Sequence, residues 1–380
     1  MSKRNSTLFT PFELSHGITL RNRIVMAPMT TWSSNGDYTV STQELEYIRN
    51  RAQGVGLVIT GCTHVQENGI GFTNEFAAYD DRFIPSLTSL ANAAKSGGAP
   101  AILQIFHAGN KAVPSLIPNA DLVSASTLAA PAGPFNDGKL KSRALSNEEI
   151  LEIIRAFGET TRRAIEAGFD GIELHGAHSF LIQNFFSPLF NQRDDQWGGS
   201  LENRMRFPLE VVREVKRVIR QYAKRPFILG YRISVEEYDA AGLRIADSLK
   251  LIDHLIANEI DYLHVSLANI LSTTPTDGDA LVAQTVSNYV GGRVSVIAAG
   301  QIKTPTQAEQ ALNLGLSAIA IGQALIMNPN WVQLAQNGRT DEIETELDLE
   351  KMPELVIPEK LQQVIEATKG WFPIKQIENA

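Results

Sequence analysis

Two histidines that stand three residues apart are the strongest chemical signal in the sequence. His175 and His178 follow directly on an apolar stretch. Within that stretch Ile172 and Leu174 are apolar, and Gly171 stands at its start. The pattern predicts a buried strand that ends at the histidine pair. Because parallel α/β folds build active sites from polar side chains at the carboxyl ends of strands, the pair is a candidate catalytic site.

Two other interpretations of the pair stay open on the residues alone. Two imidazoles can bind zinc, but no third ligand stands at a spacing typical of a zinc site, and we expect no metal. Two core histidines that hydrogen-bond to their neighbours would give the same pattern. The spacing by itself does not decide between a catalytic and a structural role.

Short apolar stretches alternate with helical patterns along the chain, which is typical of repeated βα units. Strands are expected at 23–29, 55–62, 100–106, 169–176, 226–233, 260–266, 293–299 and 316–321. Helices are expected at 41–53, 84–95, 146–167, 203–222, 245–258, 282–289 and 304–314, several of them after a capping Ser or Thr. This number and spacing of elements predicts a (β/α)8 TIM barrel, with a doubly wound sheet as the alternative.

Three segments lie outside the βα repeat. Residues 7–19 predict a small N-terminal hairpin that caps the barrel. Residues 111–145 form a long insertion after the third strand, which is typical of a lid or a binding loop. Residues of about 353–372 predict an appended C-terminal helix, whose last aromatic residues, Trp371 and Phe372, we expect to pack on the barrel or on a neighbouring subunit. The whole chain, 1–380, is expected to be a single domain.

The composition limits the partners of the protein. Its net charge is −8 and Lys and Arg form no cluster, which argues against binding to nucleic acid or to an anionic membrane surface. Cys62 is the only cysteine, so neither an intrachain disulfide nor an iron–sulfur cluster can form. The sequence contains no signal-peptide pattern and no apolar run long enough to cross a bilayer. We therefore expect a cytoplasmic enzyme for a small-molecule substrate, and a homo-oligomer is left open.

Polar residues and glycines stand at the ends of the predicted strands, where a barrel gathers them in one mouth. Amides and hydroxyls can contact the edge of a planar ring, an arginine can neutralise negative charge, and glycines admit a phosphate to backbone N–H groups. This set therefore suits a planar heterocycle that carries a phosphate, but it does not distinguish FMN from a sugar phosphate. It consists of Thr30, Cys62, Gln104, His175, His178, Arg232, Ser266, Gly300 and Gly322.

Four stretches of the sequence resemble the old yellow enzyme family of flavin-dependent ene-reductases. They are Leu20–Thr30, Gln104–Lys111, His175–His178 and Ser187–Arg204, and they follow in the family's order. The resemblance runs from about Phe9 to about Pro329. It implies a barrel that binds FMN non-covalently and takes hydride from NADH or NADPH. It does not decide between the two nicotinamides.

The resemblance also implies a role for each matching residue. Flavin contacts fall on Pro28, Thr30, Cys62, Gln104, Arg232, Gly300, Gly322 and Gln323. Thr30 would tune the flavin, Gln104 would pair with its pyrimidine edge, and Arg232 would offset negative charge on the reduced ring. Gly300, Gly322 and Gln323 would hold the phosphate. The histidine pair would donate hydrogen bonds to a substrate carbonyl and so polarise a conjugated alkene.

The chain departs from the family pattern at three of these positions. Phe180 stands where the family has a tyrosine that protonates the substrate, and a phenyl ring has no proton to give. Gln323 replaces an arginine at the phosphate, which predicts weaker FMN retention unless another cation such as Lys303 compensates. Cys62 replaces a smaller residue beside the flavin and narrows the pocket.

The remaining pocket residues have weaker signals. Trp32, Phe106 and Phe180 are expected to form pocket walls, with core packing as the other interpretation of the first two. Lys111 matches a lysine near the family's active site, or is a solvated loop charge. Glu173 is expected to point away from His175 and to be structural.

The resulting prediction is an FMN-dependent oxidoreductase that reduces the C=C bond of an α,β-unsaturated carbonyl with NAD(P)H. A quinone, nitro-compound or oxygen reductase with weak alkene activity is the first alternative, because of Phe180. A flavin-binding protein with little turnover is the second, because of Phe180 and Gln323 together. A sugar-phosphate aldolase or isomerase barrel without flavin is the third.

Overall fold

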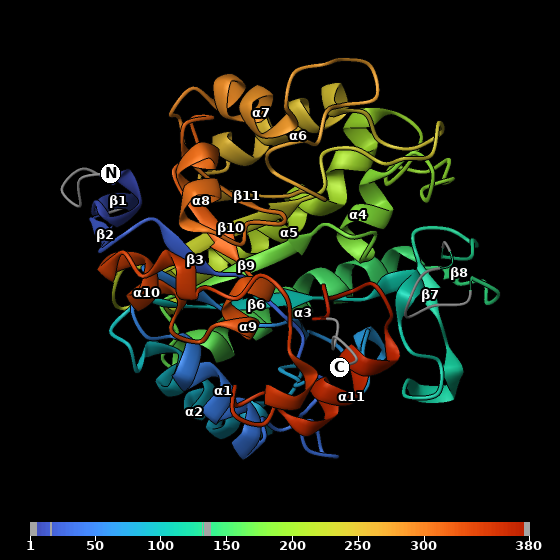
Figure 1. Ribbon diagram of the computed structural model, residues 1–380. Helices are drawn as coiled ribbons and strands as arrows, with labels where there is room; N and C mark the ends of the chain where they lie inside the picture. Colours follow the sequence, from blue (N-terminus) through green and yellow to red (C-terminus); the bar gives the residue numbers. More distant parts are fainter. Residues whose placement is uncertain (1–5, 16, 131, 133–137, 376–380) are drawn as a thin grey trace.

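The computed structural model describes residues 6–15, 17–130, 132 and 138–375 of the chain. Eight parallel strands close into a barrel with helices around it (Figure 1). The ring closes because β3 pairs with β13 on one side and with β4 on the other, and β4 pairs with β6. The predicted (β/α)8 barrel is therefore confirmed, and a doubly wound sheet is excluded because such a sheet stays open.

The barrel strands lie where the apolar stretches predict them, although most are shorter. They are β3 (Ile24–Met26), β4 (Leu57–Ile59), β6 (Ala101–Phe106), β9 (Gly171–Gly176), β10 (Ile228–Ile233), β11 (Tyr262–Ser266), β12 (Ser295–Ala299) and β13 (Ala318–Ile321). A short extra strand, β5 (Thr63–His64), pairs with β6 beyond the end of β4.

Seven helices lie within a few residues of the predicted positions. They are α1 (Thr42–Arg51), α2 (Ile84–Lys95), α3 (Asn147–Glu166), α5 (Leu201–Tyr222), α6 (Ile245–Ala257), α7 (Val282–Val290) and α8 (Pro305–Leu312). The structure adds three short helices outside the expected set, α4 (Leu181–Phe186), α9 (Gln323–Met327) and α10 (Trp331–Asn337), and the C-terminal helix α11 (Glu359–Ala367). Ser146 forms the predicted capping box, and Ser41 and Thr304, which were expected as helix caps, form capping boxes as well.

The N-terminal hairpin closes the end of the barrel that receives the strand N-termini. Its strands, β1 (Phe12–Ser15) and β2 (Ile18–Leu20), are antiparallel, as predicted. Leu14 and Leu20 pack inside the barrel against a cluster that includes Leu57. The opposite end, where the strands finish, is left free for the polar side chains.

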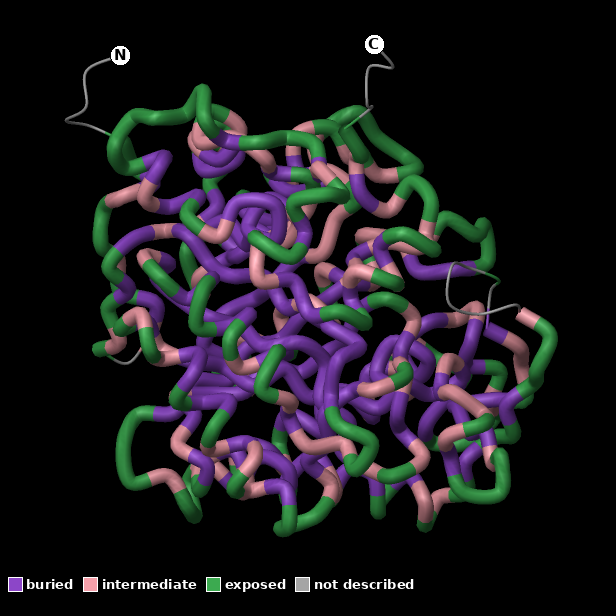
Figure 2. Tube along the Cα trace, turned by 60° about the horizontal axis from the view of Figure 1, so that its bottom comes forward, coloured by how far each residue is buried: buried purple, intermediate pink, exposed green. Residues whose placement is uncertain are grey.

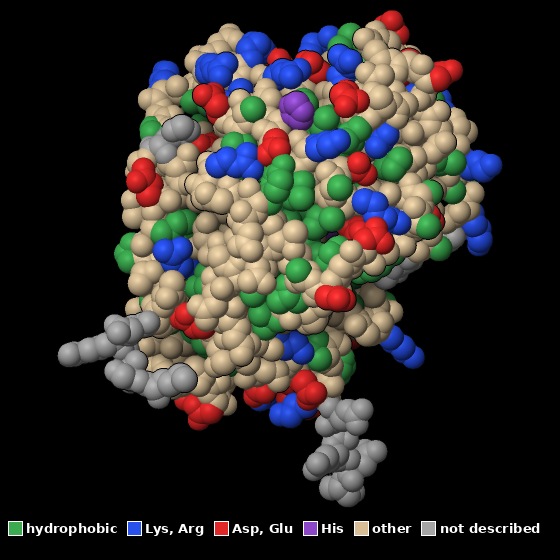
Figure 3. All heavy atoms as spheres, turned by 90° about the horizontal axis from the view of Figure 1, so that it is seen from above, with side chains coloured by type: hydrophobic (Ala, Val, Ile, Leu, Met, Phe, Trp, Pro, Cys, Tyr) green, Lys and Arg blue, Asp and Glu red, His purple; other side chains and the backbone are tan. Residues whose placement is uncertain are grey.

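Buried residues fill the barrel and the layer between strands and helices (Figure 2). The outer layer forms one large apolar cluster, in which Phe157 of α3 and Val211 of α5 are fully buried. Replacing a leucine in such a cluster by alanine typically costs about 2–5 kcal/mol. On the face in Figure 3, Lys and Arg are interspersed with Asp and Glu. In the described part of the chain no helix is long and apolar enough to cross a membrane.

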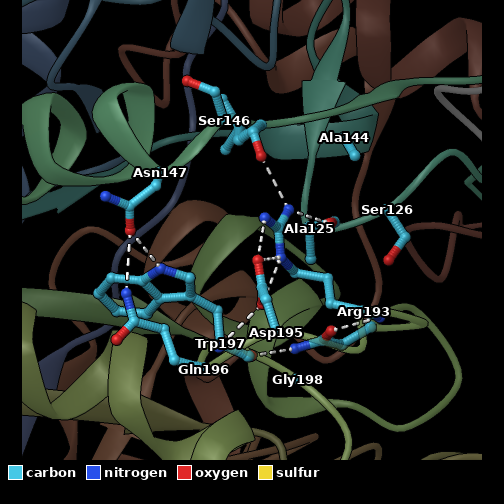
Figure 4. A network of polar contacts seen from close by, with 12 residues as sticks. Ala125, Ser126, Ala144, Ser146, Asn147, Arg193, Asp195, Gln196, Trp197 and Gly198 are labelled. Carbon is cyan, nitrogen blue, oxygen red and sulfur yellow. Dashed lines mark hydrogen bonds and ion pairs between the residues drawn. The ribbon is translucent and has the colours of Figure 1, made fainter.

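The long insertion after β6 is more ordered than the composition suggests, although residues 131 and 133–137 lie outside the described residues. It contains a two-stranded parallel sheet, β7 (Val123–Ser124) and β8 (Arg143–Ala144). Figure 4 shows how the loop after α4 holds this insertion in place. The Arg193 guanidinium donates to the carbonyls of Ala125 and Leu145 at 2.9 and 2.8 Å.

The C-terminal helix is shorter than the predicted segment of about 353–372. α11 begins only after Pro358, which takes the N-cap position, and it ends before Thr368. The aromatic residues that follow pack on the barrel, which is one of the two placements expected. Phe372 is buried, and the Trp371 ring lies 5.5 Å from that of Trp32 in an edge-to-face contact.

Candidate active site

Two adjoining cavities lie at the carboxyl ends of the strands. The larger has a volume of about 450 Å³ and contains both histidines, and we call it the histidine cavity. The smaller has a volume of about 180 Å³ and contains Gly300 and Gly322, and we call it the glycine cavity. Pro28, Met29 and Arg232 line both, so the two form one continuous depression.

The structure brings nearly all predicted site residues to this depression. The histidine cavity is lined by Pro28, Thr30, Trp32, Cys62, Gln104, Lys111, His175, His178, Phe180 and Arg232. The glycine cavity is lined by Pro28, Arg232, Gly300, Gly322 and Gln323.

Phe106 is the exception among the predicted pocket walls. Its side chain is fully buried and does not line the cavity. Its ring lies behind the wall, 4.9 Å from Phe180 and 6.1 Å from His175. Core packing is therefore the correct interpretation of Phe106, which supports the wall from behind.

Several cavity residues were not among the predicted site residues. Phe72 and Trp371 line the histidine cavity and come from loops far apart in the sequence. Their aromatic character was the only sequence signal. Ser266 ends β11. Its place at a strand end was recognised from the sequence, but nothing in the sequence indicated its role.

His175 presents a fixed hydrogen-bond donor to the histidine cavity. Its Nδ1 accepts the N–H of Ala177 at 3.3 Å, so Nδ1 carries no proton. Burial, with further contributions from His178 and Arg232, lowers the pKa of His175 well below its ordinary value. The ring is therefore neutral at pH 7, and its one proton stands on Nε2.

His178 is held by its backbone in a conformation that few side chains adopt. His178 and Ser179 both have left-handed backbones, with φ of 58° and 57°. Such residues cost about 1–3 kcal/mol each and persist only where surrounding contacts enforce them. Here Ser234 Oγ accepts the His178 N–H at 3.1 Å, and Lys111 Nζ donates to the His178 carbonyl at 2.7 Å.

A short relay orients the His178 ring. Arg232 Nη2 donates to Ser266 Oγ at 3.1 Å, and the same oxygen lies 2.7 Å from His178 Nε2. A guanidinium can only donate, so Ser266 Oγ accepts from Arg232, and the contact of the same hydroxyl with Nε2 holds the His178 ring in place. His178 is exposed at the mouth of the cavity, but partial loss of its water shell to the surrounding residues, and after it Arg232 and Lys111, lowers the pKa of His178 well below its ordinary value.

Arg232 is a buried cation with an unused donor. It is 7% exposed, and its Nε has no hydrogen-bond partner among the described residues. A buried donor without a partner costs about 1–3 kcal/mol. Because Arg232 stands where the two cavities meet, an electron-rich group bound there would satisfy it.

Glu173 lies inside the barrel, and the prediction that it points away from His175 is wrong. Residues two apart in a strand share a face, so 173 and 175 both point inward. The carboxylate accepts bonds from Gln104 Nε2 at 2.7 Å and Tyr262 Oη at 2.9 Å, and it lies 2.9 Å from His264 Nδ1. Burial alone would raise the pKa of Glu173, but His264, Arg232 and Gln104 outweigh it and the pKa is lowered. The group is therefore an anion in the core.

This anion fixes the orientation of Gln104. A carboxylate only accepts, so the Gln104 amide nitrogen must face Glu173. The amide oxygen is then left as an acceptor towards the histidine cavity, 3.5 Å from Cys62 Sγ. Thr30 hydrogen-bonds the Cys62 side chain, and burial raises the pKa of that thiol. Cys62 is accordingly an unreactive wall residue.

The glycine cavity is built mainly from backbone. A Cβ on Gly300 would come within 2.6 Å of the Leu267 carbonyl oxygen, so no side chain fits there. Gln323 faces the cavity and also donates to the Trp371 carbonyl at 2.5 Å, which ties the C-terminal segment to this end. Lys303 lines the same cavity, so it stands where a compensating cation was predicted.

Together the two cavities fit a planar ring with a phosphate tail. The ring end offers an amide acceptor and the unused Arg232 donor. The tail end offers glycine backbone and Lys303. No group of residues suited to hold a metal ion exists in the described part of the chain.

Residues 7–342 match the NADH:flavin oxidoreductase / NADH oxidase family. The chain belongs to this family. The resemblance to old yellow enzyme is thereby confirmed, and with it FMN as the cofactor and NADH or NADPH as the reductant. The aldolase and isomerase interpretation is excluded.

The chain is similar to several known proteins over most of its length. A probable NADH-dependent flavin oxidoreductase of Bacillus subtilis, YqiG, is 41% identical over 99% of this chain and 100% of its own. The NADH:fumarate oxidoreductase of Klebsiella pneumoniae is 40% identical over 94% of this chain but only 38% of its own length. The solved structure of morphinone reductase in complex with tetrahydroNAD superposes with a TM-score of 0.75 at 27% identity, covering 88% of this chain and 91% of the reductase.

Proposed function

We propose that this flavin oxidoreductase reduces the C=C bond of α,β-unsaturated carbonyl compounds at the expense of NADH. The observation that carries the proposal is the pair of neutral imidazoles, His175 and His178, which face one cavity, the first with its proton on Nε2 and the second with its ring held by Ser266. Two such donors suit a carbonyl oxygen that gains negative charge during reduction.

The cofactor would lie across both cavities and supply hydride. Gln104 would accept from the ring edge, and the unused Arg232 donor would meet its electron-rich side. Pro28, Thr30 and Cys62 would line the ring, while Gly300, Gly322 and Gln323 would hold the phosphate, with Lys303 as the nearby cation. Arg232 would thereby stabilise negative charge on the reduced ring.

The histidines would act on the substrate through hydrogen bonds. Donors placed before the reaction lose little free energy in reorganising, and removing one such donor typically lowers the rate by about 10²–10³-fold. Because both rings are neutral, the cavity gains donors without adding cations to those of Arg232 and Lys111.

NADH is proposed as the reductant because the similar proteins of Bacillus subtilis and Klebsiella pneumoniae are both named for it. The fumarate activity of the second is less informative, since this chain spans little more than a third of that protein. That fumarate activity does agree with an electron-poor alkene as the acceptor. A single domain over 1–380 and a cytoplasmic location remain predictions, and a homo-oligomer is still left open.

A quinone, nitro-compound or oxygen reductase is the second candidate. Phe180 favours it, because the ring is 5% exposed, lines the cavity and lies 4.9 Å from His175 without offering a proton. Such acceptors need no proton at carbon. A flavin-binding protein with little turnover would show slow reduction by both nicotinamides.

Anaerobic reoxidation of the pre-reduced enzyme separates these functions. We expect the flavin absorbance to return rapidly on addition of a cyclic enone. A quinone serves as the second acceptor in a separate run. Rapid reoxidation by the quinone with none by the enone would refute alkene reduction and favour the second candidate.

A further inference from the structure

Reduction of an alkene requires a proton as well as a hydride. If the proposed function holds, on which this inference rests, hydride enters at the β-carbon and negative charge spreads to the carbonyl oxygen held by the histidines. A proton must then reach the α-carbon. The cavity needs an acidic group that is not already occupied with the carbonyl.

Most titratable groups around the histidine cavity are unsuitable. His175 and His178 are neutral and hold the carbonyl. Burial raises the pKa of the Cys62 thiol, so the thiol is too weak an acid to protonate the α-carbon efficiently. Arg232 holds its proton too tightly to act as an acid at neutral pH.

Among the described residues that line this cavity, Lys111 is the remaining acid. Its ammonium lies 5.7 Å from the centre of the Phe180 ring, over the ring face. It also donates to the His178 carbonyl at 2.7 Å, and its side chain lines the histidine cavity. Burial lowers the pKa of Lys111, although Glu237 partly opposes this, so the ammonium is a stronger acid than an ordinary lysine.

The backbone around Lys111 is fixed on the cavity wall. Lys111 ends a short 3₁₀ turn, Gly109–Lys111. A Cβ on Gly109 would come within 2.4 Å of Asn184 Oδ1, and that same oxygen accepts the N–H of Asn110 at 3.3 Å. The turn is therefore packed against α4, which also follows the histidine pair.

We propose that Lys111 is the proton donor to the substrate α-carbon in this chain. One N–H bond of the ammonium breaks and leaves its electron pair on nitrogen, while a C–H bond forms at the α-carbon. The hydride for the β-carbon would come from the bound cofactor, and the C=C bond becomes a single bond. Lys111 then regains a proton from water. The lysine supplies the acid that Phe180 cannot.

The first test compares two lysine variants in the FMN-loaded enzyme. Lys111→Met should lower the saturating rate of enone reduction by about 10²-fold, the usual range for losing a general acid. Lys95→Met is the matched control, since Lys95 also donates to a backbone carbonyl, that of Gly168 at 2.6 Å, but lies outside both cavities. It should react as the wild type does. An equal loss with a quinone in Lys111→Met, or a change in KM alone, would overturn the role in proton transfer.

The second test follows the proton itself. The wild-type rate with an enone should fall as pH rises through the pKa of Lys111, because the acid must be protonated, and this alkaline limb should vanish in Lys111→Met. With an enone substituted at the α-carbon, the wild type should give one stereoisomer and Lys111→Met a mixture, since water then protonates either face. Adding Phe180→Tyr to Lys111→Met should raise the rate at least about tenfold above that of Lys111→Met alone.

The outcomes separate this role from the proposed function. A wild type that reduces enones, with an unchanged alkaline limb and unchanged stereochemistry in Lys111→Met, overturns only the role of Lys111. A wild type that reduces no enone overturns both.

Discussion

The histidine cavity and the glycine cavity meet at Arg232 but are built differently. The first consists of side chains whose orientations are set by neighbours, such as Ala177 for His175 and Ser266 for His178. The second consists largely of backbone kept open by the lack of side chains. The reaction rate should therefore depend on single polar atoms in the histidine cavity. Cofactor binding in the glycine cavity should depend on the space left by the absent side chains.

The largest effect should come from removing both histidines. In His175→Ala with His178→Ala, enone reoxidation should fall by about 10³-fold or more, because both donors to the carbonyl are lost. The flavin should stay bound, since neither residue lines the glycine cavity. Stopped-flow absorbance gives the rate, and the flavin-to-protein ratio after gel filtration gives the occupancy. Loss of the flavin would show that the two cavities are not separable in this way.

A pair of glycine variants tests the backbone-built end. Gly300→Ala should weaken FMN binding by about tenfold or more, because its Cβ would lie 2.6 Å from a backbone oxygen that cannot move aside cheaply. Gly322→Ala should bind almost normally, since its Cβ would lie 3.1 Å from the flexible Met29 side chain. Fluorescence titration of the apoprotein with FMN measures both affinities. Equal losses in the two variants would mean that space does not govern this cavity.

Glu173→Gln tests the anion beneath the ring end. Loss of its charge should leave Arg232 less neutralised and so raise the flavin reduction potential, measured by dye equilibration. It should also cost about 1–3 kcal/mol of unfolding free energy at neutral pH. Because the pKa of Glu173 is lowered in the folded state, this contribution is present above the carboxyl's unfolded pKa and is lost as pH falls through the folded one. The stability gap to wild type should therefore narrow in acid.

Glu75→Gln is the matched control for this change. Glu75 is also buried and lies 2.7 Å from His64 Nδ1, but burial raises its pKa well above the ordinary value, which favours the neutral acid. Replacing it should leave the potential where it is. A similar shift in both variants would attribute the effect to general disturbance of the core.

The smallest effect is expected at the rim of the glycine cavity. Lys303→Met should weaken FMN binding by about threefold to tenfold at low salt, since the lysine is half-buried and its attraction to a phosphate is screened by ions. The difference from wild type should shrink as salt rises. A salt-independent loss would indicate that Lys303 packs against the cofactor without acting through its charge.

Local patterns in the sequence were sufficient for the barrel and for most of the site. Strand and helix positions follow from periodicity and from caps such as Ser146 and Thr304, which act within one helical turn. The C-terminal helix was overestimated because Pro358 moves its start. Strand alternation alone places Glu173 on the inward face beside His175. The sequence therefore contained the information needed to avoid the wrong prediction for Glu173.

Local patterns suffice to identify the residues that end the strands, and a barrel necessarily gathers those residues in one mouth. Their roles there depend on contacts between segments that are far apart in the chain. The orientation of the His178 ring depends on Ser266, which is 88 residues away along the chain. The position of Lys111 over Phe180 and of Trp371 beside Trp32 depends on loops from distant βα units. Such contacts carry no local signal, because they arise from packing between segments whose separate patterns are independent.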